Sequence, residues 1–158
     1  MFGLFGSASF TDPQLGELRR SGGGWRGGLR LEGAALPLVV SGSRTAPDAE
    51  ALRLARSVSA EFAAWRPTME RALFEHYSPY AEAVAAGEAD APASGLPTID
   101  TPCSVWPHAG VEFVRVSPLS GELTVEIGCR VARDEEHTLG VRLRDRRLVE
   151  LCGSVLAP

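Results

Sequence analysis

The stretch from Thr45 to Ala86 constrains the fold more than any other part of the chain. Its apolar residues recur every three or four positions, which is the spacing of a helix that buries one face. Such a stripe must pack against something, and only the flanking, turn-rich sequence can cover it. The first stripe comprises Leu52, Ala55, Val58, Phe62 and Trp65, and the second comprises Met69, Leu73, His76, Tyr77 and Tyr80.

Prolines divide this helical stretch. Thr45 can cap a first helix, because its side-chain oxygen can accept a hydrogen bond from the first turn. Pro67 disfavours the helical conformation of the residue before it but suits the first turn of a new helix. We therefore expect two antiparallel helices, over residues 45–65 and 67–86, with the second bent or ended at Pro79; a single kinked helix is the alternative.

Short strand patterns precede the helices. Residues 1–14 read as an irregular lead-in whose phenylalanines pack onto the body. Residues 15–19 and 36–40 are short extended runs, and residues 25–31 alternate between apolar and polar, the period of a half-buried strand. The glycines of residues 21–24 supply the positive φ of a turn. Together these patterns predict a β-meander of two or three strands.

A second meander follows the helices. Extended runs over residues 111–116, 123–131, 139–144 and 147–152 are separated by turn sequences, including the two-residue turn Asp145-Arg146. The expected fold is α+β: an N-terminal β-meander, a helical pair and a C-terminal antiparallel β-meander. We expect both meanders to share one sheet with the helices packed on one face.

Composition limits the class of protein. The 158 residues fit a single domain (1–158), and 44% hydrophobic with 23% charged residues is typical of a soluble globular chain. The net charge of −4 argues against a nucleic-acid partner. All sixteen basic residues are arginine, which indicates a bacterial genome of high GC content.

Cysteine usage and the N-terminus bear on location. Cys103, Cys129 and Cys152 are an odd number at wide spacing, which favours free thiols in a reducing cytoplasm. The first residues carry no positive charge before a short apolar run, and no apolar run reaches the roughly 20 residues that a membrane span needs. We expect a cytoplasmic protein with no membrane partner.

One polar cluster has the residue types of an active or metal site. Asp134, Glu135, Glu136 and His137 are consecutive, and His108 is the other imidazole near a strand start. Carboxylates with imidazoles can bind a metal or act as acid and base. Consecutive strand residues point to opposite faces, however, so a solvated charged turn is the favoured interpretation. His76 lies on the second stripe, where we expect a buried, hydrogen-bonded histidine.

Other candidates concern binding. The chain has no serine elbow and no lysine for a phosphate loop or a Schiff base, so we expect no cofactor, no metal and no catalytic residue. The candidates for contact with a partner are Trp25, Trp106, Arg142, Arg144 and Arg146. Together with Arg147, the three arginines form a basic edge, which either protects an edge strand from aggregation or contacts an acidic partner. The acidic, proline-rich residues 87–102 form either a linker or a binding loop.

Several short patterns carry a resemblance. They are Phe10-x-Asp12-x-x-Leu15-Gly16-x-Leu18, Trp25-x-Gly27, Phe74-x-x-Tyr77 and Asp134-Glu135-Glu136-His137-x-x-Gly140-Val141. Together they resemble a family of small bacterial domains of unknown function, in which an acidic pair and a histidine–glycine open a strand. Here Thr138 takes the place of that glycine. The resemblance implies a compact α+β domain without established enzyme activity, similar to domains of toxin-immunity and other interaction proteins.

Two functional hypotheses follow. The leading one is a non-enzymatic protein-interaction domain, in an immunity-like or similar function, with a protein partner; a homodimer through the last strand stays open. The alternative is an enzyme or a small-ligand or metal binder, whose site residues would be His137, His108, Glu135 and Glu136. The alternative requires His137 and His108 to share one pocket.

Overall fold

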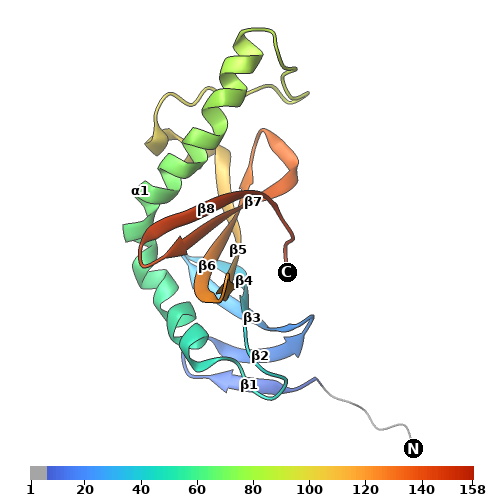
Figure 1. Cartoon of the computed structure of the whole chain (residues 1–158), viewed down its shortest axis with the longest axis vertical. Coiled ribbons are helices and arrows are strands. Elements are labelled where there is room, and N and C mark those ends of the chain that lie inside the picture. Colours follow the sequence, from blue (N-terminus) through green and yellow to red (C-terminus); the bar gives the residue numbers. More distant parts are fainter. Residues whose placement is uncertain (1–6) are drawn as a thin grey trace, which may run out of the picture.

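The computed structural model describes residues 7–158, except for the side chain of Glu135. The described chain forms four strands, one long α-helix, two short 3-10 helices and four more strands (Figure 1), which confirms the α+β class. The elements are β1 (Ser9–Asp12), β2 (Gly16–Ser21), β3 (Gly24–Leu31), β4 (Ala34–Val40), α1 (Ala49–Ala85), η1 (Pro102–Ser104), η2 (Trp106–His108), β5 (Ala109–Leu119), β6 (Glu122–Val131), β7 (Asp134–Arg144) and β8 (Arg147–Val155).

The eight strands form one sheet in the order of the sequence, from β1 to β8. Every neighbouring pair is antiparallel except β4 and β5, which run parallel with Leu38 opposite Val114. A tight turn can join only antiparallel strands, so a parallel pair needs a long crossover. The crossover here contains α1, which joins the two predicted meanders into a single sheet.

The predicted helical pair is wrong, because α1 runs from Ala49 to Ala85 through both Pro67 and Pro79. Each proline removes one main-chain hydrogen bond and crowds the preceding turn. The buried stripe nevertheless keeps its spacing across Pro67, from Trp65 to Met69. Packing of this continuous stripe on the sheet therefore outweighs the local cost of the prolines.

The helix also begins later than expected. Asp48, not Thr45, is the N-cap, and its carboxylate accepts a hydrogen bond from the N–H of Ala51 at 2.9 Å. Thr45 belongs to a preceding turn, where its N–H donates to the hydroxyl of Ser43 at 3.2 Å. Asp48 is the better cap because its negative charge also lies at the positive end of the helix dipole.

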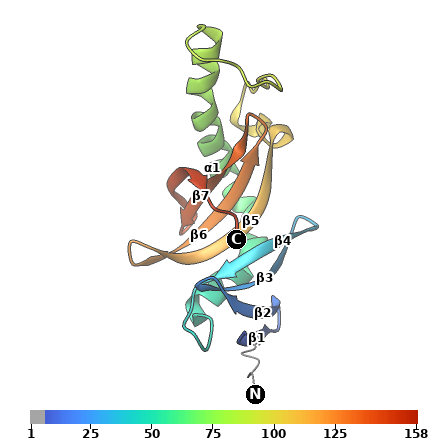
Figure 2. The ribbon, with the colours of Figure 1, turned by 90° about the vertical axis from the view of Figure 1, so that its right-hand side faces the viewer.

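The core lies between α1 and one face of the sheet. Figures 1 and 2 show the helix along one side of the strands, with its C-terminal end and residues 87–102 extending past the sheet. In the described chain, no helix combines the length and the apolar character that crossing a bilayer requires. Fully buried side chains on the two sides of the core include Leu18, Trp25, Leu38, Val58, Met69, Ile127 and Leu139.

Four strands, not two or three, precede the helix. The additional strand β1 lies within the predicted lead-in and pairs with β2, with Phe10 opposite Leu18. Phe10 packs edge-on against Trp25, with ring centroids 6.4 Å apart. The packing expected for Phe2 and Phe5 concerns residues outside the described range.

Candidate functional site

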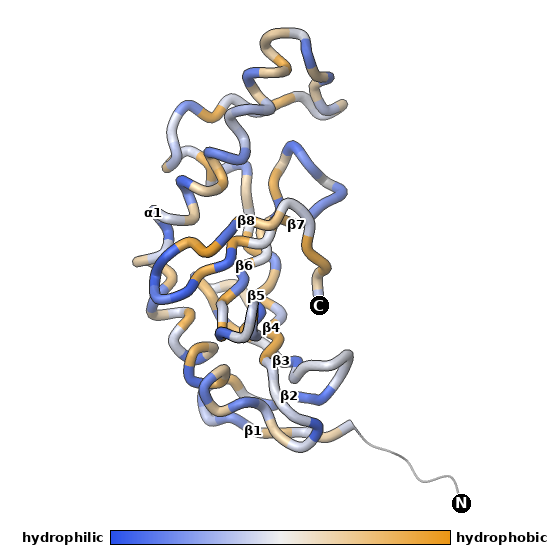
Figure 3. Tube along the Cα trace, in the orientation of Figure 1, coloured by the Kyte–Doolittle hydropathy of each residue, from blue (hydrophilic) through white to orange (hydrophobic). Residues whose placement is uncertain are grey.

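The β7–β8 hairpin gathers most of the features that bear on function. Its turn, Asp145-Arg146, has positive φ at both residues, 47° and 63°, as a two-residue hairpin turn with the twist of its strands requires. The sequence predicts this turn correctly. Figure 3 shows hydrophilic residues at the tip of the hairpin and hydrophobic residues along its strands.

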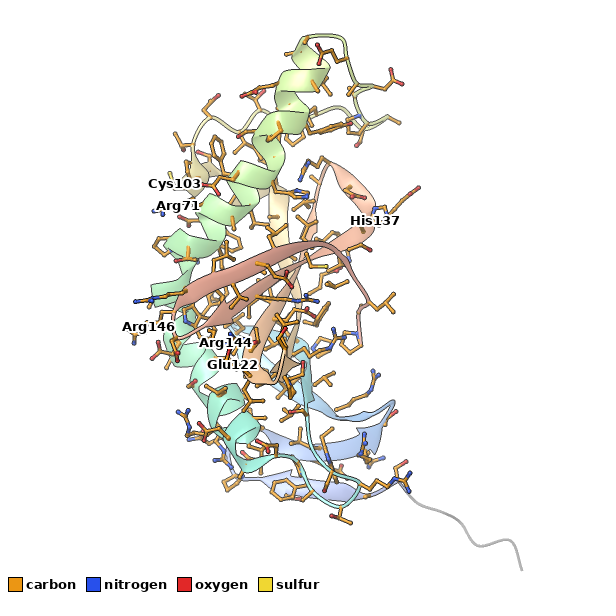
Figure 4. The ribbon with its side chains drawn as sticks, in the orientation of Figure 1. Arg71, Cys103, Glu122, His137, Arg144 and Arg146 are labelled. Carbon is orange, nitrogen blue, oxygen red and sulfur yellow. The ribbon has the colours of Figure 1, made fainter. Side chains whose placement is uncertain are left out.

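The arginines of the predicted basic edge already have carboxylate partners within the chain. Figure 4 shows Arg144 beside Glu122 and Arg146 beside α1. The pairs of Arg144 and Arg146 are partly exposed, so each contributes at most about 1 kcal/mol, whereas Arg142 contacts the buried Glu126. The basic edge therefore offers an acidic partner less free charge than the sequence predicts. Arg142 contacts Glu126 and Glu150, Arg144 contacts Glu122, and Arg146 contacts Glu61 of α1.

Strand β8 is the open edge of the sheet. Among the described strands it pairs only with β7, and its first four residues are all exposed. The pairing is regular from Glu150 to Cys152, with shifts in register on either side. Leu148 is 38% exposed and Val149 is 41% exposed. The opposite edge, β1, has only four residues.

A cavity of about 260 Å³ lies between the hairpin and α1. Its apolar walls come from Leu54, Leu123, Val125 and Leu143, and Trp65 and Arg144 also line it. The indole nitrogen of Trp65 and Nε of Arg144 are buried donors without an acceptor among the described residues. The sequence gives no signal for this cavity, because its walls come from three separate elements.

A charged cluster occupies the sheet face opposite the helix. Glu126 is 5% exposed and lies between two arginines, accepting a hydrogen bond from Arg115 Nη1 and another from Arg142 Nε, each at 2.7 Å. Arg142 also binds Glu150 of β8. The hydrogen bond to Glu126 is the main cause that raises the pKa of Arg142 above its ordinary value. This network joins β5 to β8 and holds the edge strand in place.

The Asp134–His137 segment forms the start of β7. Asp134 Oδ1 accepts hydrogen bonds from the N–H groups of Glu136 and His137, and it lies 2.9 Å from His137 Nδ1. Burial alone would raise the pKa of Asp134, but the hydrogen bonds from His137 outweigh it, and the pKa of Asp134 is lowered. The arrangement closes a turn, with Glu136 and His137 both exposed. The side chain of Glu135 lies outside the description.

His108 lines two spaces beside the start of β5 and the end of β6, and, among the described residues, His137 lines neither of them. The first is a pocket of about 20 Å³, the size of a water molecule, shared with Tyr77, and the second is an open hollow shared with Glu112. The structure therefore brings His137 together with Asp134 but not, in these pockets, with His108.

The two candidate tryptophans differ in position. Trp25 is fully buried, and its indole N–H donates to the carbonyl of Ser43 at 3.1 Å, so its ring offers no surface to a partner. Trp106 is half-buried, and its N–H donates to Glu70 of α1 at 2.6 Å. Arg66 stacks over the Trp106 ring, 4.8 Å from its centroid.

The remaining polar candidates do not form a metal site. His76 is exposed, contrary to our expectation, and its Nδ1 contacts the guanidinium of Arg133. The neighbouring side chains still shield part of its ring from water, and this desolvation, together with the charge of Arg133, lowers the pKa of His76. Burial raises the pKa of the Cys129 thiol to about 12. Among residues 7–158 with described side chains, no group of three or more histidines, cysteines or carboxylates is placed to hold a metal ion.

The connection after α1 is tied to the helix. Tyr77 donates its hydroxyl to the carbonyl of Pro97 at 2.5 Å, and Tyr80 donates to the carbonyl of Asp90 at 2.6 Å. These bonds hold residues 87–102 against the end of α1. The tyrosines that the sequence places on the second apolar stripe thus anchor the connection through their polar ends.

Most of the chain matches the model of one protein family. Residues 14–155 match the family described as Domain of unknown function (DUF6985). The chain belongs to the DUF6985 family. This confirms the resemblance to a family of domains of unknown function, while the closing motif and the toxin-immunity likeness lie beyond what the match shows. Comparison of this DUF6985 chain with curated proteins and with solved structures finds no match.

Proposed function

We propose that this DUF6985 chain is a non-enzymatic protein-interaction domain that pairs β8 with an extended segment of another protein. One observation supports the proposal above the rest: the exposed large hydrophobic residues of the described chain all lie on β8 or directly after it. Single exposed apolar residues are common, but their concentration on an open edge strand is the pattern of a binding surface. They are Leu148, Val149 and Leu156.

Main-chain groups supply the binding energy in this proposal. An edge strand presents N–H and C=O groups on its outer side, and an added strand satisfies them. The regular pairing of Glu150 to Cys152 with β7 keeps β8 extended there, so that a partner strand can follow it. Leu148 and Val149 then provide apolar contact next to the paired backbone.

Charge has a small part in the recognition. Arg142, Arg144 and Arg146 are engaged by carboxylates of the same chain. Interactions between exposed charges weaken with salt, whereas backbone pairing and apolar contact do not. We therefore expect the affinity for the partner to change little between low and physiological salt.

The partner in this proposal is a different protein. An immunity-like function, with a toxin as the partner, is one form of it. Pairing of β8 with β8 of a second copy is the competing outcome. Light scattering on the purified chain separates the two: a monomer is expected, and a concentration-dependent dimer abolished by Val149→Lys would replace the proposal with self-association.

Site-specific cross-linking tests the proposal. A photoreactive phenylalanine derivative is introduced at Val149, or at Ala35 on β4 as an exposed control, and the full chain is irradiated in its native cells. We expect one protein to be cross-linked from position 149 and not from position 35, through an extended segment identified by mass spectrometry. Leu148→Lys in the same chain should remove the product. The same set of products from both positions would overturn the proposal.

A further inference from the structure

Strands β4 and β5 pair over only part of their length. The parallel register joins residues 38–40 of β4 to residues 114–116 of β5. Both strands begin well before these residues, β4 at Ala34 and β5 at Ala109. Figure 2 shows the two strands diverging toward their N-terminal ends. The sheet is therefore continuous at one end of this pair and forked at the other.

Two local features open the fork. The N–H of Ser41 donates to the carbonyl of Val116 at 2.9 Å, so the main-chain groups of every second residue back along β4 also face β5. Pro37 is one of these residues, and proline has no N–H to donate. On β5, a bulge between Val111 and Phe113 disrupts the regular pairing. A proline on one strand and a bulge on the other thus end the pairing just before the joined residues.

A cleft of about 300 Å³ lies in the fork. Leu36 of β4 and Val111 of β5 line it from the two strands, and Arg66 of α1 and Trp106 of η2 line it from beside the sheet. Arg66 and Glu32 are the charged residues of the lining, and their side chains bind each other at 2.5 Å. The rest of the lining is apolar or glycine, so the charges of the cleft balance.

Main-chain groups on both sides of the cleft lack a strand partner across it. In the described chain, the register of β4 with β5 includes neither residues 34–37 nor residues 109–113. An extended peptide satisfies such groups by pairing with them, as a strand added to a sheet edge does. Here two edges face each other, so one peptide can pair with both. Three small residues, Ala34, Ala109 and Gly110, line the cleft and leave room for its side chains.

We infer that the fork between β4 and β5 binds a short extended peptide with an uncharged, apolar centre. The peptide main chain pairs with the free edges of both strands, and its apolar side chains pack against Leu36, Val111 and Trp106. The paired charges of the lining disfavour a charged centre, which would lose its hydration without gaining a partner. The fork is separate from β8, which lies at the far edge of the sheet, so this inference does not depend on the function proposed for β8.

Selection from a phage library of random decapeptides tests the inference, with the full chain as bait in reducing buffer. We expect enrichment of peptides with an uncharged, apolar centre, whose affinity is then measured by fluorescence anisotropy. Ala34→Trp fills the cleft from an exposed position and should weaken these peptides at least about tenfold. Ala35→Trp is the matched control, because Ala35 is also exposed but does not line the cleft. Circular dichroism shows that both variants fold.

A further variant and a second measurement make the result decisive. A peptide that Val149→Lys loses and Ala34→Trp keeps binds at β8, which would overturn the fork inference and leave the proposal for β8 standing. Hydrogen exchange of the unchanged protein needs no variant: with the selected peptide bound, residues 34–37 and 109–113 should gain protection. Unchanged exchange in both segments, full affinity for a folded Ala34→Trp, or a library that yields no enriched peptide would overturn the inference.

Discussion

Asp12 and Arg56 join the first edge of the sheet to the helix. The buried carboxylate of Asp12 accepts hydrogen bonds from Arg56 Nε at 2.9 Å and from Nη2 at 2.5 Å. The hydrogen bond from Arg56 lowers the pKa of Asp12 to about 2. Strand β1 is thus short and fastened to α1, whereas β8 is long and carries the exposed apolar residues. The two edges of the sheet differ in a way that fits a binding role for β8 alone.

This pair gives the protein a pH-dependent contribution to stability. The carboxylate of Asp12 has a folded pKa of about 2 and an ordinary value of 3.8, so the pair stabilises fully above pH 3.8 and is lost as the pH falls through 2. Asp12→Asn should lower the free energy of unfolding by about 2 kcal/mol at pH 7. The difference from the unchanged protein should shrink between pH 3.8 and 2.

Urea unfolding at a series of pH values measures this difference. Glu17→Gln is the control, because Glu17 forms an exposed pair with Arg19 and should change stability by less than about 0.5 kcal/mol. A difference between Asp12→Asn and the unchanged protein that stays constant down to pH 2 would contradict the role assigned to this pair.

Replacing a proline within α1 should stabilise the protein. Pro67 lies in an exposed position inside a continuous helix, where proline costs about 3 kcal/mol relative to alanine. The greater freedom of alanine in the unfolded chain removes part of this gain. Pro67→Ala should therefore raise the free energy of unfolding by about 1–2 kcal/mol, measured by thermal and urea unfolding. A loss of stability would mean that the chain needs a break between two helices at this point.

Glu126 should be far more sensitive to change than the exposed carboxylates of the sheet. It is buried between Arg115 and Arg142, so Glu126→Gln leaves Arg115 without its carboxylate and Arg142 with Glu150 alone. We expect a loss of about 2–4 kcal/mol in the free energy of unfolding. Glu122→Gln, whose side chain is 68% exposed, is the matched control and should lose less than about 1 kcal/mol. Equal effects of both changes on chemical unfolding would show that the network contributes nothing beyond surface charge.

Two glycines on strands, Gly128 and Gly110, differ in how much space surrounds them, and this difference tests the packing of the core. A Cβ atom at Gly128 would lie 2.2 Å from the ring of Phe113, while one at Gly110 would meet nothing within 4 Å. Phe113 is fully buried, so its ring has little room to move. Gly128→Ala should destabilise the protein by about 1–3 kcal/mol, and Gly110→Ala should be nearly neutral. Similar melting temperatures for the two variants would contradict this packing.

The sequence predicts the strands better than the helix. Local periodicity identifies β5 to β8 and the turn at Asp145-Arg146, because alternation and turn chemistry are short-range signals. The break expected at Pro67 is wrong because the propensity of one residue is a local cost, while the stripe that runs on through Met69 is buried along the whole helix. The spacing of that stripe across Pro67 was the signal for a single helix.

The candidate site was harder to predict. Arg142, Arg144 and Arg146 are visible in the sequence as a basic edge, but their carboxylate partners come from β6, β8 and α1 and depend on tertiary structure. Likewise, no periodicity brings Trp65 to the same cavity as Arg144. The sequence alone does not distinguish an exposed Trp25 from a buried one. Its burial becomes evident only from the tertiary packing, in which Phe10 lies against its ring.

The most direct test of the β8 proposal is hydrogen exchange of its amides, measured by mass spectrometry with and without the protein cross-linked from Val149. Edge amides exchange readily when nothing pairs with them, and an added strand slows them. We predict that residues 147–152 gain protection in the complex while β1, at the other edge, is unchanged. Unaltered exchange over residues 147–152, with protection in another part of the chain, would contradict strand pairing along β8.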